Sequence, residues 1–362
     1  MTKLDSNTFV PITFVFHPDW WYKNHGVTFK QDFFFDPDTR LEADLEMRKV
    51  LDDYLEEFGL EQEEEIEPRP SVGGVHLAAG YIISQMFGCN VKYSKGRAPQ
   101  VHPRKISDEE ADNITPVELE NNPVFNRLDK MVRKLKDRFG YVVGDINWGG
   151  VLNVALDIRG SKLLLDLNRN PDRANRIFDA VTTTIIDFLS YIKENTGTTS
   201  ISVNRAVKFV KPELNLHSNC SVTMISPDTY KDMLLEYDER LSRNFQPYGI
   251  HHDGDDLHVY ADNYAKVPNV SFYDVGWGSD IEVCREKLPE AFFNLRYDPK
   301  KMGQASPEEV KSDVSKMLRQ SGDPHKTGFC CINMMDGDAP KENLSAAVEA
   351  VREYRNRFSE GS

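Results

Sequence analysis

The sequence predicts a (β/α)8 barrel with an N-terminal helical extension, and three observations lead to this fold class. From about residue 140 onward, short β-prone segments alternate with amphipathic helical ones, which is typical of parallel βαβ units. These β-prone segments turn polar at their carboxyl ends, where the loops of a barrel build an active site. The main alternative, a doubly wound open sheet, usually has a glycine-rich first turn, and the nearest glycine cluster, GDINWGG at 144–150, has the wrong spacing.

The length of the chain also suits one barrel. At 362 residues the chain is long for an ordinary domain but natural for a barrel with insertions. We find no internal repeat and no low-complexity linker, so we expect a single domain over 1–362. In this division 1–140 supplies the N-terminal extension and the first barrel elements, and 141–362 supplies the remaining βα units.

Each expected element rests on a local pattern. Residues 41–58 read as an exposed amphipathic helix, and 72–87 as an apolar one. Pro or acidic start signals support several of the later helices. These are expected at 122–138, 171–195, 226–242, 306–320 and 340–357. Strands are expected at 141–145, 200–204, 214–218, 248–252, 270–274, 292–296 and 329–333.

Composition narrows the partners and the compartment. The formal net charge is −14 and the basic residues are scattered, which argues against nucleic acid or an anionic membrane as the main partner. No apolar run is long enough to span a bilayer, and the short N-terminal apolar patch is soon interrupted by His17-Pro18-Asp19, unlike a signal peptide. The 5 cysteines are odd in number and lack the spacing of a disulfide framework, so we expect a reducing cytoplasm.

The segment GIHHDGD at 249–255 holds the densest set of reactive side chains. Because side chains alternate along a strand, His251 and Asp253 should share one face. His252 should then point the other way, so it is either a substrate contact or a packing residue.

Other predicted strand ends carry further candidates. Asp274 could act in the pocket or only orient a histidine, and Arg296 could clamp an anion or pair with a strand-end acid. His217 and Asn219 could serve the pocket or cap the following helix, and Asn147 ends the strand at 141–145.

Several segments together resemble one superfamily. The segments at 220–237, 249–255, 272–299 and 340–354 are similar, in order and spacing, to segments of the uroporphyrinogen decarboxylase superfamily. Residues 17–26 and 87–101 resemble its N-terminal segments. The resemblance implies a (β/α)8 barrel, in agreement with the pattern of the elements, and also implies a homodimer.

This superfamily includes porphyrin decarboxylases and zinc-dependent methyltransferases that serve corrinoid pathways. The decarboxylases hold substrate carboxylates with two arginines and use one key aspartate. Here Lys23, Val27 and Ala79 stand at the matching positions, so the resemblance does not extend to porphyrinogen decarboxylation.

The methyltransferases bind zinc through a His-x-Cys-Gly motif and a cysteine of the last strand. The matching residues are His251-His252-Asp253-Gly254, with Asp253 in place of the first cysteine, and either Cys330 or Cys331. Only one of these adjacent cysteines can point into a barrel. The resemblance thus implies zinc at His251, Asp253 and Cys330 or Cys331, an N/O/S set with an open fourth position.

The expected function is therefore metal-assisted methyl transfer or demethylation of a small molecule. We see no cobalamin-binding motif in the sequence, so a corrinoid would come from a partner protein or free. In this hypothesis Asp253, Asp274 and His217 are catalytic, while Arg296, Asn219, His252 and Asn147 contact the substrate.

Two other hypotheses remain open. The first is a metal-free decarboxylase or lyase of a small carboxylic acid, with Asp253 or His251 carrying the proton and Arg296 anchoring the substrate. The second is a non-catalytic subunit that binds a corrinoid protein.

Overall fold

A computed structural model describes residues 3–4, 10–60, 66–73, 80–146, 148–197, 210–211 and 214–359. The strand predicted at 200–204 and the candidate Asn147 lie outside these residues. None of the helices in the described ranges is long and apolar enough to cross a membrane.

A six-stranded sheet organises the fold, and its strands run in the order β2-β12-β11-β10-β9-β8. Every neighbouring pair in it is parallel, as the alternation of strands and helices predicted. The strands are β2 (Ile12–Phe16), β8 (Asn215–Ser218), β9 (Tyr248–His252), β10 (Val270–Val275), β11 (Phe292–Tyr297) and β12 (Thr327–Met334). The described fold is thus an α/β half-barrel of parallel strands.

A second, separate parallel pair, β3 (Ser71–Gly73) and β6 (Val143–Asp145), precedes β8 in the chain. An isolated parallel bridge joins Gly149, just after β6, to Ser218 at the end of β8. Closure of these strands into an eight-stranded barrel stays a prediction. Strand β2 falls inside the predicted N-terminal extension, so the described chain begins its main sheet there and does not show a helical extension ahead of it.

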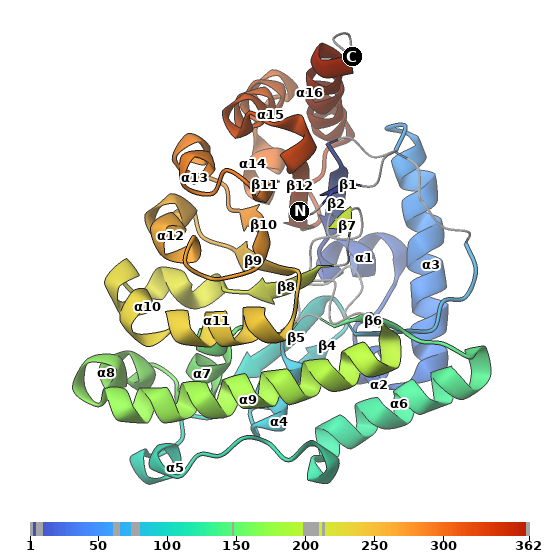
Figure 1. Ribbon diagram of the computed structural model, residues 1–362. Helices are drawn as coiled ribbons and strands as arrows, with labels where there is room; N and C mark the ends of the chain where they lie inside the picture. The colour runs from blue at the N-terminus through green and yellow to red at the C-terminus, as the bar shows by residue number, and fades with distance from the viewer. Residues whose placement is uncertain are drawn as a thin grey trace.

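Helices flank the sheet, with α12, α13, α15 and α16 on the outer side of the strands from β9 to β12 (Figure 1). Asn170, Ser226 and Ser306 cap the starts of three of the predicted helices, and Ser306 forms a capping box with Glu309. The helix predicted at 72–87 is wrong at its start, because Ser71–Gly73 pairs with β6 as a strand.

The remaining bounds complete the element order. The helices are α1 (Pro18–His25), α2 (Gln31–Phe35), α3 (Pro37–Glu56), α4 (Ile82–Met86), α5 (Asp108–Asp112), α6 (Pro123–Phe139), α7 (Val151–Arg159), α8 (Lys162–Arg169), α9 (Pro171–Thr196), α10 (Pro227–Met233), α11 (Leu235–Asn244), α12 (Leu257–Tyr264), α13 (Ile281–Lys287), α14 (Pro299–Gln304), α15 (Pro307–Ser321) and α16 (Lys341–Ser359). Two antiparallel pairs lie outside the main sheet, β4 (Asn90–Ser94) with β5 (Arg97–His102) and β1 (Lys3–Leu4) with β7 (Val210–Lys211).

The two faces of the main sheet have different neighbours. Leu216, Phe272 and Phe292 cluster with one another and with Leu214, whereas Val15, Cys330 and Ile332 form a second small cluster. The strand residues of both clusters lie on one face of the sheet, which we call the inner face. The alternate strand residues join the large core that the helices cover, and we call that the outer face. The candidate site lies at the carboxyl ends of the strands on the inner face.

Candidate functional site

Strand β9 places His251 and Asp253 on the inner side of the sheet and His252 on the outer side. His251 pairs in register with Ser218 of β8 and Asp274 of β10. His251 Nε2 lies 3.9 Å from Asp253 Oδ1. His251 and Asp253 therefore share one side of the sheet and His252 points to the other, as expected from the alternation of side chains along a strand.

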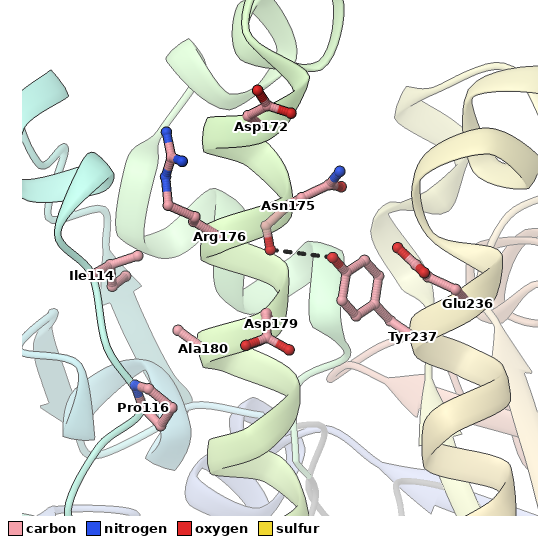
Figure 2. A pocket seen from close by; sticks show the side chains of 9 residues that line it. All are labelled: Ile114, Pro116, Asp172, Asn175, Arg176, Asp179, Ala180, Glu236 and Tyr237. Atoms are coloured by element: carbon pink, nitrogen blue, oxygen red, sulfur yellow. Dashed lines mark hydrogen bonds between the residues drawn. The ribbon is translucent and has the colours of Figure 1, made fainter.

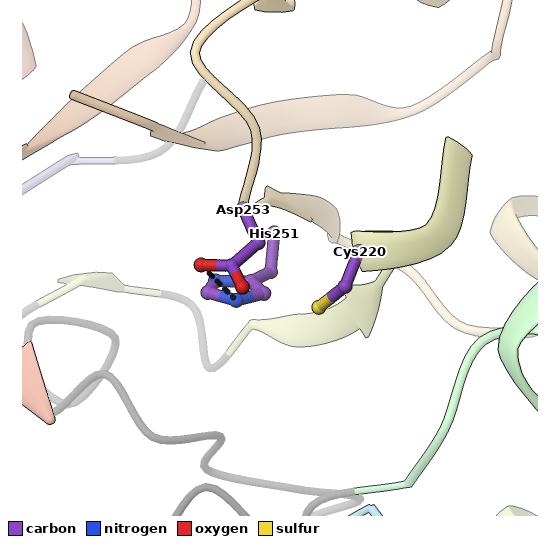
Figure 3. A group of neighbouring side chains, drawn as sticks. All are labelled: Cys220, His251 and Asp253. Atoms are coloured by element: carbon purple, nitrogen blue, oxygen red, sulfur yellow. Dashed lines mark ion pairs between the residues drawn. The ribbon is translucent and has the colours of Figure 1, made fainter. Parts of the chain in front are cut away.

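A third side chain, Cys220, joins this pair from the turn that follows β8. Cys220, His251 and Asp253 each offer one ligand atom, and these atoms all lie within 4.8 Å of one another. Figure 3 shows the sulfur of Cys220 directed toward the imidazole and carboxylate. We call these three residues the Cys220 group. The sequence reasoning missed Cys220, although it lies in a segment, 220–237, that resembles the superfamily.

Asp274 and Asn294 support His251 from the neighbouring strands. Asp274 Oδ2 lies 2.6 Å from His251 Nδ1, and Asn294 Nδ2 donates to Asp274 Oδ1 at 2.9 Å. All three side chains are buried. The predicted role of Asp274 in orienting a histidine agrees with this arrangement.

The charges within the Cys220 group shift the pKa values of its members. Burial would raise the pKa of the Cys220 thiol, but the charge of His251 and a hydrogen bond from it bring that pKa below its usual value. Burial likewise opposes the charged form of His251, yet Cys220 and Asp274 raise the pKa of this imidazole to about 10. Without a metal, the interaction between the two side chains therefore lowers the pKa of the Cys220 thiol and raises that of the His251 imidazole, so each charged form stabilises the other.

Arg296 pairs with Asp253 on the inner face. Arg296 Nη1 donates to Asp253 Oδ1, which is the oxygen nearest to His251 Nε2. Although burial would raise it, Arg296 and then His251 lower the pKa of the Asp253 carboxyl to about 2. The side chain of Asp253 is still 46% exposed, so it faces both its partners and the open end of the site.

The two adjacent cysteines of β12 point in opposite directions, as expected. Cys330 lies on the inner face, where Asn294 Nδ2 donates to its sulfur at 3.0 Å. Cys331 packs in the helix-covered core. Burial raises the pKa of both thiols. Within the described ranges, neither belongs to the group of candidate ligands around His251.

His217, Asn219 and His252, all expected near the pocket, lie in a buried network on the outer side of the sheet. Asp238 of α11 receives hydrogen bonds from Asn219 Nδ2 at 3.2 Å and Tyr230 Oη at 2.5 Å, and its Oδ1 lies 3.1 Å from His217 Nε2.

His252 extends the same network. Its Nδ1 lies 3.0 Å from Tyr264 Oη, and its Nε2 lies 2.9 Å from Asp256 Oδ1. The structure therefore does not bring these three polar residues to the Cys220 group.

The donor set of the Cys220 group fits a zinc ion. It offers one sulfur, one nitrogen and one oxygen, each a common zinc ligand. Zinc bonds of about 2.0–2.3 Å in a tetrahedron separate ligand atoms by roughly 3.3–3.8 Å, so the observed spacing needs only small side-chain movements. The contact of Asp274 with His251 Nδ1 leaves Nε2 as the ligating atom, an arrangement common among metal-bound histidines.

Two surface pockets lie elsewhere, and neither shares a residue with the Cys220 group. One, of about 500 Å³, lies between α9, α11 and residues 114–116 (Figure 2). Tyr237 Oη donates to the backbone oxygen of Asn175 at 3.2 Å within it. The other, of about 530 Å³, lies between residues 86–88 and 104–117 and includes Arg104 and Glu110. These pockets carry no cluster of candidate metal ligands among the described residues.

Comparison with solved structures finds the same fold over almost the whole chain. A methyltransferase from Methanosarcina mazei superposes with a TM-score of 0.65 at 14% identity, covering 97% of this chain and 96% of that one. A B12-independent methionine synthase from a Shewanella species, in complex with selenomethionine, has a TM-score of 0.52 at 10% identity and covers 97% and 100%.

Sequence comparison identifies the family. No curated protein sequence matches the chain. The model of the uroporphyrinogen decarboxylase (URO-D) family, however, matches residues 78–354, well over half of the chain. The expectation drawn from the order of the segments is confirmed, and the chain belongs to the uroporphyrinogen decarboxylase family.

Proposed function

We propose that this protein is an enzyme that transfers or removes a methyl group of a small molecule at a zinc ion held by Cys220, His251 and Asp253. The convergence of these three side chains at the strand ends of the inner face carries the proposal. The fold shared with a methyltransferase and a methionine synthase supports a methyl-transfer reaction. This ligand set retains His251 and Asp253 and uses Cys220 instead of Cys330 or Cys331.

The chain's own residues would prepare the site in defined ways. Asp274 accepts the proton of His251 Nδ1, which leaves the Nε2 lone pair for a metal, and Asn294 holds Asp274 in place. His251 lowers the pKa of Cys220, which eases the loss of the thiol proton that metal binding requires. A zinc ion bound there would act as a Lewis acid and lower the pKa of an incoming thiol. Asp253, in place of a cysteine, would make that ion a harder Lewis acid.

The donor and the assembly are part of the same proposal. A methylcorrinoid carried by a separate protein would supply the methyl group, and the chain would act in the cytoplasm as a homodimer with a closed (β/α)8 barrel. These features come from the family resemblance.

Metal content and thiol-dependent demethylation of methylcobalamin test the proposal together. We expect about one zinc per chain and thiol-dependent loss of the methylcobalamin absorbance. The variants Cys220→Ser and His251→Ala should lose both. The matched control Cys331→Ser removes a buried thiol of the outer face and should retain both. A correctly folded protein that takes up no zinc would contradict the metal site.

A metal-free acid–base reaction is the second candidate. The observation in its favour is the Arg296–Asp253 pair, which already neutralises one of the three candidate ligands. In that reaction His251, held between Asp274 and Cys220, would donate the proton to a decarboxylating substrate. Activity that survives exhaustive chelation would favour this candidate over the zinc enzyme.

A further inference from the structure

The inner face beside the Cys220 group has hydrogen-bonding capacity that the described chain leaves unused. Arg296 Nε, Asn294 Oδ1 and Thr13 Oγ1 are buried, and no described residue forms a hydrogen bond with any of these three atoms. Arg296 is 9% exposed, Thr13 is 6% exposed and Asn294 is fully buried. Buried polar atoms are paired in most native structures, and a bound ligand is one common reason for an exception.

Strand register gathers these three residues around Cys330. Arg296 of β11 pairs with Cys330 of β12, and Cys330 pairs with Thr13 of β2. Asn294, two residues before Arg296 on the same face, donates to Cys330 Sγ through its amide nitrogen, which leaves its Oδ1 available. Two donors and one acceptor therefore face the same interior next to the candidate metal ligands.

Asp253 links this cluster to the metal site. Its Oδ1 accepts from Arg296 Nη1 and lies 3.9 Å from His251 Nε2. A metal ion that takes this oxygen withdraws the charge that balances Arg296. Arg296 cannot lose its proton, so the buried guanidinium then needs another anion.

We propose that Arg296 binds a carboxylate of the substrate when Asp253 ligates the metal, with the Thr13 hydroxyl as a second donor. Asn294 Oδ1 would accept a hydrogen bond from a neighbouring hydroxyl or amino group of the same molecule. This inference rests on the proposed function and names its substrate class, a small carboxylic acid that carries the thiol or the methyl group. A guanidinium recognises a carboxylate through charge-assisted hydrogen bonds, which are stronger than neutral ones.

Two thiols that differ in an acidic group provide the test. Isothermal titration calorimetry with the zinc-loaded protein compares 3-mercaptopropionate with the neutral 2-mercaptoethanol. We expect the acid to bind at least about tenfold more tightly, as hydrogen bonds to a charged group allow. In Arg296→Met this preference should fall to about one, while zinc content and binding of 2-mercaptoethanol are retained.

Two further variants separate a local effect from a general one. Thr13→Val has nearly the same shape and should reduce the preference by a few fold, so it tests the inference even if Arg296→Met does not fold. Arg243→Met removes the same charge from the exposed surface of α11 and should leave the preference unchanged.

Each outcome of the titration bears on the inference. Equal binding of the two thiols by the zinc-loaded wild type overturns it, as does an unchanged preference in a folded Arg296→Met. If the protein takes up zinc but binds neither thiol, or takes up no zinc, the proposed function fails first and this inference fails with it. Binding of 2-mercaptoethanol without any preference for the acid leaves the proposed function intact and overturns the inference alone.

Discussion

His251 Nδ1 lies 2.6 Å from Asp274 Oδ2, and this contact determines which nitrogen of His251 can act in the site. The other nitrogen, Nε2, faces the oxygen of Asp253 at 3.9 Å. Because Asp274 is fully buried and held by Asn294, the orientation of the imidazole is built into three neighbouring strands. The site is therefore preorganised for a ligand at Nε2.

The first prediction concerns this orienting contact. Asp274→Asn keeps the shape of the side chain but removes the charge that favours the Nδ1 proton. We expect zinc affinity to fall about 10- to 100-fold, the usual effect of losing a partner of a ligating histidine. Competition with a chromophoric chelator measures the affinity. Asp256→Asn is a matched control, because Asp256 lies 2.9 Å from the outer-face His252, and its zinc affinity should match that of wild type.

A second prediction follows from the thiol pKa values. The pKa of Cys220 is lowered, whereas burial raises that of Cys89 to about 11 and that of Cys284 to about 12. Because the thiolate is the nucleophile, iodoacetamide should label Cys220 first. As pH falls from 9 to 7, its labelling rate should fall less than that of a thiol with an ordinary pKa, which loses most of its thiolate over this range.

Peptide mapping by mass spectrometry checks this labelling pattern in the zinc-free protein. His251→Asn removes the positive charge that lowers the pKa of Cys220, so labelling at pH 7 should slow. Zinc should protect Cys220 from the reagent. Preferential labelling of Cys89 or Cys284 at pH 7 would contradict the electrostatic picture of the site.

The sequence could predict the local part of the site but not its long-range part. Alternation along one strand was enough to separate His251 and Asp253 from His252. Cys220 was missed because it reaches His251 only through the pairing of β8 with β9, where Ser218 lies opposite His251. Register between strands depends on the packing of the whole sheet, and a local pattern does not encode it.

In the fold, too, local sequence patterns predicted some elements, whereas long-range strand pairing could not be predicted. The parallel strands from β8 to β12 were expected from their alternation with helices. Strand β2 was read only as an apolar patch of the N-terminus, since nothing in its five residues indicates that it will pair with the last strand. A contact between the two ends of a chain is the least local feature of a sheet.

A third prediction concerns the network around Asp238, whose carboxylate is buried under α11. Asp238→Ala would leave the Tyr230 hydroxyl without its acceptor and the Asn219 amide with only the Tyr264 hydroxyl, so we expect about 2–4 kcal/mol less free energy of unfolding. Urea denaturation measures the change. Glu236→Ala, on the exposed side of the same helix, should change stability by no more than about 0.5 kcal/mol.

His217 belongs to the same network, and a substitution there distinguishes a structural role of this side chain from a catalytic one. His217→Gln should lower the stability by about 1–2 kcal/mol, because Asp238 loses one of three close polar partners. Zinc content and turnover per folded molecule should stay at the wild-type level. A variant that retains its stability and zinc but loses turnover would show instead that His217 is catalytic.

The fourth prediction tests the residue in which this chain departs from the methyltransferase motif. Asp253→Cys replaces a carboxylate ligand by a thiolate, and zinc binds thiolate strongly. We expect zinc affinity to rise, because zinc binds thiolate more strongly than carboxylate and a thiolate sulfur accepts a weaker hydrogen bond from Arg296 than the carboxylate oxygen does. The softer ligand should also make the bound ion a weaker Lewis acid, so thiol-dependent demethylation should slow even though more zinc is bound.

Asp255→Cys, two residues further along the loop, controls for the added thiol and should change neither the zinc affinity nor the rate of demethylation. Zinc affinity that is unchanged in Asp253→Cys would indicate that the residue at position 253 does not ligate the metal.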